Sequence, residues 1–586
     1  MIINIELGTD KKTGLPFYLR PEWLRTHLHM LGSTGSGKTA TIRNILAALA
    51  LEPRNPYAIF IVDAIGNLSY EFLQWMANEE RCPPEVRERL VYLEPARTEF
   101  VMPFNPLIHH NADELYYQVY RTVEIILRAW ASQHIEEMPR LRHWMVAAFF
   151  AVAAMGYPIA MCRYLLRPGS DEHKSLLRQL PSELQNMWSE ILNSRGGNEA
   201  VRLLESTRNR LAPFFDSGIL RRMFSSVKSY FDVPRFIRER RIVILNLASR
   251  GQLDEQSARA IAGLEVNEIV QQAKSMSPSE VDPTVVLLDE FEQFVSEDLA
   301  AALPLVRQVG LQFILSHQSM SQLVRGDIDL TGIIWQCRSR LIFSNDADDA
   351  NRLAEEFTYL TYDPYKLKEI LTTKRQRIVG HESKWLRNQS HSETHSHAVD
   401  QQQGQSTAAG SGLTRPETGE LGTKANNQTY TTSNGRSEKT ADGTAHSKGL
   451  SETLVPIHED FEEVSNKTYF PFDDQMVEWG KLIRTKPTGE AFGKFKDDPN
   501  VYDLALTYRP VNDTPEIRQK VEELIQRNFE SDFFVPASQI ESEAEELRLN
   551  LLRRPPIVLD HRLNSPPLGI PDKKLGEQKK DDNPYR

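Results

Sequence analysis

The segment Gly32-Ser-Thr-Gly-Ser-Gly-Lys-Thr39 constrains the fold of this chain more than any other feature. It matches the pattern GxxxxGK[ST] in full, and it separates a short apolar run, Leu28 to Leu31, from a helical pattern, Thr39 to Leu51. Glycines at this spacing allow backbone N–H groups to close around phosphates, and the helix N-terminus adds the positive end of its dipole. We therefore predict a phosphate-binding loop within a strand–loop–helix unit.

The residues of this loop have different expected roles. Lys38 is predicted to neutralise the β- and γ-phosphates of a nucleotide, and the hydroxyl of Thr39 is predicted to coordinate Mg²⁺. The nucleotide is expected to contact Gly32, Ser33, Thr34, Gly35, Ser36, Gly37, Lys38 and Thr39.

A second apolar run, Thr284 to Leu288, ends in the acidic pair Asp289-Glu290. Alone, such a pair is more often a helix cap, but after a complete phosphate-binding loop it indicates a magnesium-binding and catalytic strand end. We predict that Asp289 holds Mg²⁺ and that Glu290 is the general base for the attacking water. Gln318 follows the next apolar run, Leu311 to Leu315, and is predicted to contact the γ-phosphate.

Three further runs predict buried strands: Tyr57 to Val62, which ends at Asp63, Arg241 to Leu247, and Ser339 to Phe343. Strands that alternate with helical segments in this way are typical of a parallel sheet. From residue 112 to residue 224, apolar residues instead recur at helical spacing. The sequence therefore predicts an α/β fold with an inserted all-helical domain.

The remaining segments are distinguished by composition. Residues 388–449 are rich in Ser, Thr, Gln, Gly, Asn and His and contain almost no large aliphatic residues. Such a composition buries too little apolar surface to fold, so we predict a disordered linker. The full predicted order is an N-terminal β-hairpin (1–20), the first part of the α/β domain (21–111), the helical insert (112–224), the second part of the α/β domain (225–387), the linker (388–449), a small α+β segment (450–510), and helices with an extended tail (511–586).

The bulk composition excludes some classes of protein. A formal net charge of −11 argues against a simple basic protein that coats DNA, although basic residues inside a ring channel remain compatible with it. The three cysteines show neither metal-binding spacing nor even pairing, which indicates a reducing compartment. The uncharged stretch from Trp144 to Cys162 is interrupted at Gly156-Tyr157-Pro158, so we predict a buried helix and no membrane span.

Two clusters resemble binding sites, but we interpret them differently. One histidine cluster lies in the tract predicted to be disordered, which disfavours a metal site at His391, His395 and His397. One arginine cluster directly precedes a buried strand, which favours a solvated helix face for Arg235, Arg238, Arg240 and Arg241.

Several motifs together resemble the HerA/FtsK superfamily of P-loop ATPases: GSTGSGKT at 32–39, FNPL at 104–107, STRNRLAPFF at 206–215, RIVILNLA at 241–248, LLDEFEQF at 287–294 and VRQVGLQFILSHQSMSQL at 306–323. Within it, the chain is most similar to the TraD/TraG-like conjugative coupling ATPases of type IV secretion. The similarity covers about residues 20–380 and, more weakly, 451–510. It implies a RecA-like motor domain, ATP and Mg²⁺ as ligands, and a homohexameric ring that moves DNA through its pore.

The resemblance also assigns roles to single residues. Lys38 and Thr39 match the Walker A positions, Asp289 and Glu290 the Walker B positions, and Gln318 the sensor glutamine.

Other residues match the pattern of the family less completely. Arg307 lies where coupling proteins carry an arginine proposed to act on the nucleotide of a neighbouring subunit, and Arg338 and Arg340 are rivals for that role. Asp63 matches an acidic strand end of the family, but the lysine often found near it is missing. The membrane segment that precedes the motor in membrane-bound coupling proteins is also missing, so we expect a cytoplasmic protein that only a partner would hold at the membrane.

The combined prediction is an ATPase that couples hydrolysis to DNA translocation in conjugative or type IV secretion-type transfer. Its expected partners are DNA of unspecified form, further copies of the same chain, and a secretion, relaxase or nuclease protein. A HerA-type DNA-processing or defence ATPase and a nucleotide-switched recruitment protein remain open as alternatives. Glu290 favours hydrolysis over a pure switch, because a switch needs no strong base.

Overall fold

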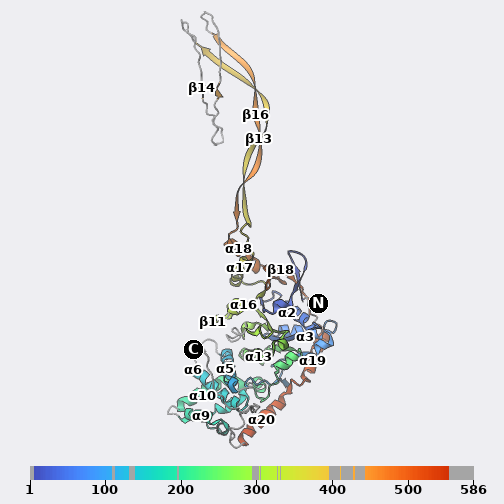
Figure 1. The fold of residues 1–586 in the computed structure, drawn as a ribbon, viewed down its shortest axis with the longest axis vertical. Coiled ribbons are helices and arrows are strands. Elements are labelled where there is room, and N and C mark those ends of the chain that lie inside the picture. Colours follow the sequence, from blue (N-terminus) through green and yellow to red (C-terminus); the bar gives the residue numbers. More distant parts are fainter. Residues whose placement is uncertain are drawn as a thin grey trace, which may run out of the picture. The chain divides into compact units, whose positions relative to one another are not determined.

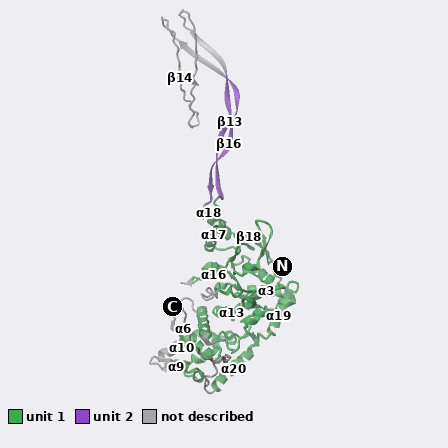
Figure 2. Cartoon of the chain, in the orientation of Figure 1, with its two compact units in different colours: residues 1–364, 471–586 green, residues 365–470 purple. Residues whose placement is uncertain are grey.

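The computed structural model describes residues 5–108, 112–130, 139–193, 197–293, 303, 305–325, 328–329, 331–394, 409–410, 427–428, 443–511 and 513–553. The chain divides into two compact units (Figure 2). Unit 1 comprises residues 1–364 and 471–586, and unit 2 comprises residues 365–470.

An eleven-stranded sheet forms the centre of unit 1, in the order β2-β1-β18-β17-β12-β3-β9-β8-β4-β7-β5. The seven strands from β12 to β5 are parallel, and the four at the other side pair antiparallel. The strands are β1 (Ile5–Asp10), β2 (Pro16–Leu19), β3 (Leu28–Leu31), β4 (Ala58–Asp63), β5 (Leu90–Leu93), β7 (Ile242–Asn246), β8 (Thr284–Asp289), β9 (Leu311–His317), β12 (Ser339–Ile342), β17 (Glu490–Lys494) and β18 (Val501–Leu506).

Every residue of the seven parallel strands is buried. Parallel strands are covered on both faces, which is why they appear in the sequence as continuous apolar runs rather than as alternating patterns. The predicted α/β class and the strands expected at 57–62, 241–247, 284–288, 311–315 and 339–343 are confirmed, each within two residues of its predicted ends.

Helices surround the sheet and form the insert. The helices outside the insert are α1 (Pro21–Leu24), α2 (Lys38–Ala50), α3 (Asn67–Ala77), α4 (Pro84–Arg87), α12 (Val233–Arg238), α13 (Glu255–Ser275), α14 (Pro278–Val281), η2 (Phe291–Gln293), η3 (Met320–Leu323), α16 (Gly332–Gln336) and α17 (Ala347–Thr361). Between the short strand β6 (Phe100–Val101) and α12, all described elements are helical: α5 (Ala112–Trp130), α6 (Pro139–Ala154), η1 (Ile159–Met161), α7 (Cys162–Leu165), α8 (Asp171–Gln179), α9 (Ser182–Asn193), α10 (Gly197–Asp216) and α11 (Gly218–Met223). These helices gather as one group in Figure 1.

The uncharged stretch at 144–162 lies within this group. Phe149 and Val152 of α6 are fully buried, as expected for a core helix. Across the described residues, no single helix is long and apolar enough to cross a membrane. The segments Leu141–Ala154 and Ile159–Leu165 meet that test only as a pair, and the chain bends by 114° between them.

The chain returns to the sheet of unit 1 after residue 470, within the small α+β segment predicted at 450–510. After α18 (Phe472–Arg484), β17 pairs with β12, β18 pairs with β17, and β1 of the N-terminal hairpin pairs with β18. The hairpin expected at 1–20 and the one expected at 491–508 therefore belong to one sheet. Antiparallel strands can be joined by short turns, so β17 and β18 extend the sheet beyond β12 as a hairpin.

The helices predicted at 515–529 and 538–552 are present as α19 (Pro515–Phe529) and α20 (Ala537–Arg553). The short strand β19 (Val535–Pro536) pairs with β6 between them. Arg548 of α20 forms an ion pair of 2.7 Å with Glu172 of α8. These contacts attach the end of the chain to the helical insert, and Figure 1 shows α20 along that group.

Unit 2 contains the boundary predicted at 387 and the linker predicted at 388–449. Strand β13 (Leu367–Thr394) pairs antiparallel with β16 (Gly443–Tyr469), so both ends of the predicted linker lie in strands. Two other described strands, β14 (Ala409–Gly410) and β15 (Asn427–Gln428), pair with each other, and two more, β10 (Val324–Arg325) and β11 (Ile328–Asp329), form a small hairpin in unit 1. Most of the predicted linker, residues 395–408, 411–426 and 429–442, lies outside the described residues.

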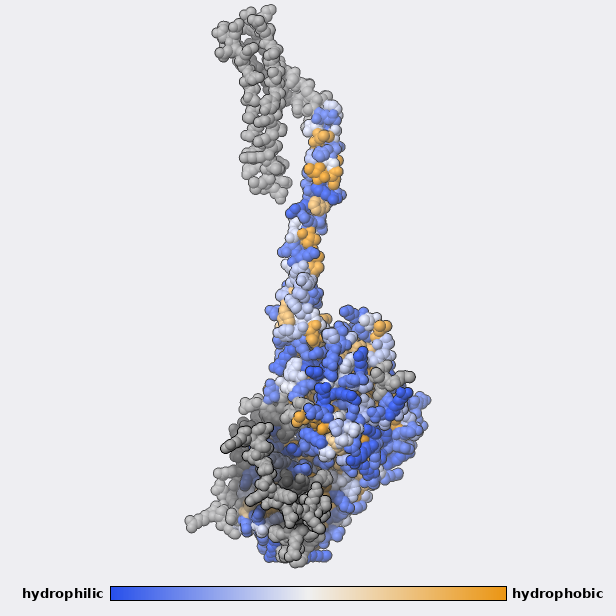
Figure 3. All heavy atoms as spheres, viewed as in Figure 1, coloured by the Kyte–Doolittle hydropathy of each residue, from blue (hydrophilic) through white to orange (hydrophobic). Residues whose placement is uncertain are grey.

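The side chains of this ladder are mostly exposed. Figure 3 shows apolar residues between polar ones along unit 2, and Ile378, Trp385 and Leu454 are each more than half exposed. Ion pairs join the strands at Arg375–Glu463 and Arg377–Glu459.

Candidate nucleotide-binding site

A cleft of about 580 Å³ lies where the parallel strands of unit 1 end. Open α/β sheets bind their ligands at this carboxyl edge, because loops and helix N-termini converge there. The cleft brings together residues that the sequence predicted separately, from the phosphate-binding loop, the end of β8 and the end of β9: Ser33, Thr34, Gly35, Gly37, Lys38, Thr39, Asp289, Glu290 and Gln318.

The phosphate-binding loop connects β3 to α2, as predicted. Gly37 precedes the first turn of α2 and has a φ of +106°. This backbone conformation is strained for any residue with a side chain, but glycine adopts it freely. A Cβ atom on Gly32 would lie 2.5 Å from the Cβ of Phe343, so a larger residue does not fit there. Packing therefore requires a glycine at position 32, and the backbone conformation favours one at position 37.

Lys38 is a buried lysine whose Nζ lies within the loop. It donates hydrogen bonds to the carbonyl oxygens of Gly32 and Ser33, the latter at 3.4 Å. Burial lowers the pKa of Lys38, while the nearby carboxylates of Glu290 and Asp289 raise it. The ammonium group thus lies between the loop and the acidic strand end, where a phosphate of a bound nucleotide would contact it.

Asp289 is buried at the end of β8, beside Asp63 at the end of β4. Burial, followed by the charge of Asp63, raises the pKa of Asp289 to about 7, although a hydrogen bond from Ser316 acts in the opposite direction. A carboxylate in such surroundings is stabilised by a cation.

The hydroxyl of Thr39 and the carboxylate of Asp289 line the same cleft. Hydroxyl and carboxylate oxygens are the ligands that Mg²⁺ prefers, so this pair fits the ion. The hydroxyl of Ser36 is buried without a hydrogen-bond partner among the described residues. The loop thus has an unused polar atom, as expected of a cradle for phosphate oxygens.

Glu290, Gln318 and Thr34 form a continuous hydrogen-bonded series across the cleft. Gln318 Nε2 donates to Glu290 Oε1 at 2.8 Å, and Thr34 Oγ1 donates to Gln318 Oε1 at 2.9 Å. Glu290 is buried, and its backbone has a φ of +52°, which is uncommon for a residue with a side chain. The predicted base and the predicted sensor are thus in direct contact with each other and, through Thr34, with the phosphate-binding loop.

Asp63 has a mainly structural role. Its carboxylate accepts hydrogen bonds from the backbone N–H groups of Ile65, Gly66 and Ser69, at 3.0, 2.8 and 2.7 Å. It therefore fixes the loop before α3, and this loop contributes Ile65 and Asn67 to the cleft.

One wall of the cleft was missed by the sequence analysis. Thr488, Gly489, Leu506, Thr507 and Tyr508 line it, and they come from the ends of β17 and β18. The backbone N–H of Gly489 donates to the carbonyl of Ser36 at 2.9 Å, and a Cβ on Gly37 would lie 3.2 Å from Gly489. The only sequence signal for this wall is the hairpin pattern at 491–508, which gives no indication of its neighbours.

The three candidate arginines differ in position. Arg307 precedes β9 and Arg338 precedes β12, so both lie at the amino ends of parallel strands, opposite the cleft. Arg307 is exposed and has no ion-pair partner within the described part of the chain, whereas Arg338 lies 3.9 Å from Asp497. None of these arginines lines the chain's own cleft.

Arg340 corrects the prediction that it rivals Arg307. Its side chain is only 5% exposed and forms an ion pair with Glu356, and its guanidinium lies 4.5 Å from the ring centre of Trp335. A buried and paired guanidinium on a central strand cannot reach a neighbouring subunit.

The clusters set aside in the sequence analysis contribute nothing to the cleft. Arg235 and Arg238 lie on α12 and form ion pairs within the chain, as expected for a charged helix face. Arg240 and Arg241 follow the helix, which corrects their prediction: Arg240 donates to the carbonyls of Asp282 and Pro283, and Arg241 pairs with Glu239. His391 lies in β13, and His395 and His397 lie outside the described residues.

Three solved structures illustrate what the chain is similar to. Among solved structures, the bacterial conjugative coupling protein TrwBdeltaN70 in an unbound form is 14% identical with a TM-score of 0.47, covering 87% of this chain and 90% of that one. TrwB in complex with ADP and Mg²⁺ is 14% identical with a TM-score of 0.46, covering 87% and 92%. VirB4 of Thermoanaerobacter pseudethanolicus is 13% identical with a TM-score of 0.39, covering 60% and 87%.

No curated protein matches the chain. A family model, however, matches residues 11–358, which is more than half of the sequence, and it describes the type IV secretion-system coupling protein DNA-binding domain. This match spans the phosphate-binding loop, the helical insert, Asp289-Glu290 and Gln318. The chain therefore belongs to the family of type IV secretion-system coupling proteins.

Proposed function

We propose that this chain is an ATPase that couples hydrolysis to DNA translocation as a homohexameric ring in type IV secretion-type DNA transfer. The observation that carries the ATPase is the series Thr34–Gln318–Glu290, which joins a phosphate-binding loop to a buried carboxylate. The proposal of DNA as the transported molecule is supported by the family, whose description is that of a DNA-binding domain.

ATP would bind with its phosphates in the loop. Lys38 neutralises the β- and γ-phosphates, and the N-terminus of α2 stabilises their charge through its backbone N–H groups. Mg²⁺, held by Thr39 and Asp289, would neutralise further phosphate charge. The side of the cleft formed by Thr507 and Tyr508 lies beside the first turn of α2, where it would contact the ribose and base.

Glu290 would act as the general base in hydrolysis. It accepts a proton from water as the water oxygen attacks the γ-phosphorus, and the bond from that phosphorus to the bridging oxygen of ADP breaks. Gln318 holds the carboxylate of Glu290 through its amide N–H and would exchange this contact for one with the γ-phosphate. Release of phosphate would then alter the contact between β9 and the loop, which is one route from hydrolysis to movement.

A ring is supported by the position of Arg307. An exposed arginine at the edge opposite the chain's own cleft is suited to reach the cleft of the next subunit, where it would stabilise charge in the transition state. A secretion, relaxase or nuclease protein is the expected further partner.

The first test is ATP hydrolysis by the full chain with and without single-stranded and duplex DNA. Lys38→Ala provides the blank, and Lys174→Ala, which changes an exposed lysine of α8, provides a matched control. The proposal is supported if DNA strongly stimulates ATP hydrolysis by the wild type and by Lys174→Ala but not by Lys38→Ala. Hydrolysis that is indifferent to DNA would instead indicate a motor for another substrate, and ATP binding without hydrolysis would indicate a nucleotide switch.

A further inference from the structure

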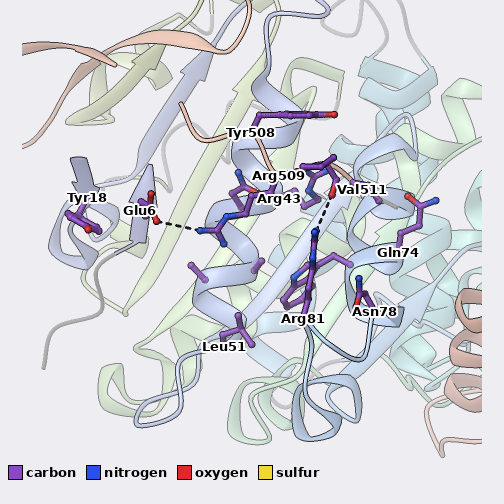
Figure 4. A pocket seen from close by; sticks show the side chains of 15 residues that line it. Glu6, Tyr18, Arg43, Leu51, Gln74, Asn78, Arg81, Tyr508, Arg509 and Val511 are labelled. Atoms are coloured by element: carbon purple, nitrogen blue, oxygen red, sulfur yellow. Dashed lines mark hydrogen bonds and ion pairs between the residues drawn. The ribbon is translucent and has the colours of Figure 1, made fainter. Parts of the chain in front are cut away.

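A second cleft of about 560 Å³ lies beside the nucleotide cleft in unit 1 (Figure 4). It is bounded by α2, α3, the N-terminal hairpin and the segment 508–511. Tyr508 lines both clefts and separates them. We name the second cleft the arginine pocket, because Arg43, Arg81 and Arg509 line it.

The charges in the arginine pocket are unbalanced. Among the described residues that line it, Glu6 is the one carboxylate, and it lies 3.6 Å from Arg509. Arg43 is buried and already satisfied, since it donates to Glu71 at 2.6 Å and to the carbonyl of Arg509. Arg81 is exposed and donates to the carbonyl of Pro510 at 3.0 Å, but within the described residues it has no carboxylate partner.

The guanidinium groups of Arg43 and Arg81 also repel each other. Burial lowers the pKa of Arg43, Glu71 and Tyr508 raise it, and the charge of Arg81 lowers it. Two cations that repel each other are both stabilised when an anion binds between them. The guanidinium N–H groups of Arg81 and Arg509 that are not used in the chain offer the geometry that phosphate oxygens prefer.

The other walls are suited to a planar ring. Tyr508 is 71% exposed and Tyr18 is 40% exposed, and both residues line the pocket. Ala47, Ala48 and Trp75 supply apolar contacts, and Asn78 supplies an amide. The volume falls in the range of small-ligand sites, roughly 300 to 1,000 Å³.

We infer that the arginine pocket binds a nucleoside phosphate, with the phosphate on Arg81 and Arg509 and the base against Tyr508. Both a free mononucleotide and a nucleotide within a DNA strand have this chemistry. The site is distinct from the phosphate-binding loop, because neither Arg81 nor Arg509 lines the nucleotide cleft.

The pocket is also connected to the nucleotide cleft. Asn44 of α2 donates to the carbonyl of Thr507 at 2.7 Å, and Arg43 of the same helix holds the carbonyl of Arg509. Segment 507–511 is therefore fixed to the helix that begins at Lys38. A ligand that fixes Tyr508 in the arginine pocket changes a wall of the nucleotide cleft.

The experiment measures binding in the Lys38→Ala chain, in which the phosphate-binding loop is disabled. Equilibrium dialysis with radiolabelled AMP, a ten-residue oligothymidylate and inorganic phosphate gives the affinity for each probe. Arg81→Gln and Arg509→Gln are compared with Arg54→Gln, which changes an exposed arginine outside the pocket. Wild-type protein saturated with ADP and Mg²⁺ gives a second, independent measurement.

We expect Arg81→Gln and Arg509→Gln each to weaken binding about tenfold, the size of one lost charge-assisted hydrogen bond, and Arg54→Gln to leave it unchanged. Tyr508→Ala should weaken AMP or oligonucleotide binding but not phosphate binding. Binding of AMP identifies a free nucleotide as the ligand, and binding of the oligonucleotide alone identifies a strand.

Two results would overturn the inference. Equal affinity for phosphate and AMP would show a simple anion site with no place for a base. Binding of AMP and oligonucleotide that is indifferent to both arginine substitutions would place the ligand elsewhere. Neither result depends on hydrolysis or translocation, so the proposed function is tested separately.

Discussion

Gln318 Nε2 donates a hydrogen bond of 2.8 Å to Glu290 Oε1. The same amide accepts from Thr34 Oγ1 at 2.9 Å, so its orientation is set at both ends. A carboxylate that serves as a base must be aimed at water, and this amide is the group that aims it. We therefore propose that the residue predicted to sense the γ-phosphate also positions the proposed base.

Gln318→Ala should reduce ATP turnover about ten- to a hundredfold while ATP affinity stays within about twofold, because the base loses its positioning contact but the loop remains. Thr34→Val, which removes only the hydroxyl, should give a smaller loss, and Thr34→Ser should behave as the wild type. Steady-state hydrolysis and nucleotide binding are measured on the same preparations. A Gln318→Ala chain with normal turnover would remove this residue from the mechanism.

Glu290→Gln should bind ATP and Mg²⁺ with near-normal affinity and hydrolyse it about 10²- to 10⁴-fold more slowly, since an amide is nearly isosteric but accepts no proton. Glu85→Gln, at an exposed position of α4, serves as the control. Single-turnover hydrolysis separates the chemical step from product release. Rapid turnover by Glu290→Gln would assign the base to another group.

Arg307→Ala should lower hydrolysis at least about tenfold in the assembled ring, while ATP binding to the single chain is unchanged. The decisive measurement mixes Arg307→Ala chains with Glu290→Gln chains. A Glu290→Gln chain still carries Arg307, which can act on the intact cleft of an Arg307→Ala neighbour, so the mixture should be more active than either variant alone.

If mixing restores nothing, Arg307 does not act between subunits. Arg338→Ala is then the next variant to test, because Arg338 is exposed at the same edge of the sheet. Arg340→Ala serves as the structural comparison, since it leaves the carboxylate of Glu356 without its buried partner and should lower stability in every assay.

Much of the site was predictable because its residues follow strands. Asp63, Asp289 and Gln318 each end or follow an apolar run, and the carboxyl ends of parallel strands meet at one edge. The phosphate-binding loop was recognisable from its local pattern alone. These inferences need only local sequence and the rule that such strands lie side by side.

The wall formed by Gly489 and Tyr508 was not predictable in this way. It reaches the loop only because β17 pairs with β12, and pairing between strands distant in sequence leaves no local pattern. The different positions of Arg338 and Arg340 could not be predicted from local sequence either. They are two residues apart, but one precedes β12 and the other is buried in it, and only the sheet order decides which is exposed.

His29 and His317 form a buried pair, and from this pair we predict that the folded chain loses stability in acid. Their Nε2 atoms lie 2.8 Å apart, and His317 Nδ1 lies 3.0 Å from the carbonyl of Ser319. Nδ1–H of His317 must donate to that carbonyl, so its Nε2 accepts from His29 and both rings are neutral. Burial lowers the pKa of both, that of His317 to about 3.

The sign of the effect follows from the protons bound. Below the pKa of about 6.5 that histidine has in the unfolded chain, the unfolded state binds protons that the folded state does not. The free energy of unfolding should therefore fall by about 1.4 kcal/mol per pH unit for His317 between pH 6.5 and 4, and the lowered pKa of His29 should make the slope steeper below pH 6.5. His29→Gln/His317→Gln, which can keep one hydrogen bond, should show a shallower slope in chemical denaturation. The exposed His143→Gln should keep the wild-type slope, and an equal slope in the double variant would contradict the pair's role.

For Glu265 we predict the opposite effect of pH on the free energy of unfolding. It lies on α13 and is fully buried, and neither carboxylate oxygen has a hydrogen-bond partner among the described residues. Burial raises its pKa well above the usual value, so the folded chain keeps a proton that the unfolded chain releases above about pH 4.5. Stability is therefore lost as pH rises. Glu265→Met should raise the thermal unfolding midpoint at pH 8, with a gain of about 1–3 kcal/mol that shrinks towards pH 4.5. Glu268→Gln, on the same helix, should show no such trend. A lower midpoint for Glu265→Met at every pH would mean that the carboxylate is stabilised in the folded chain.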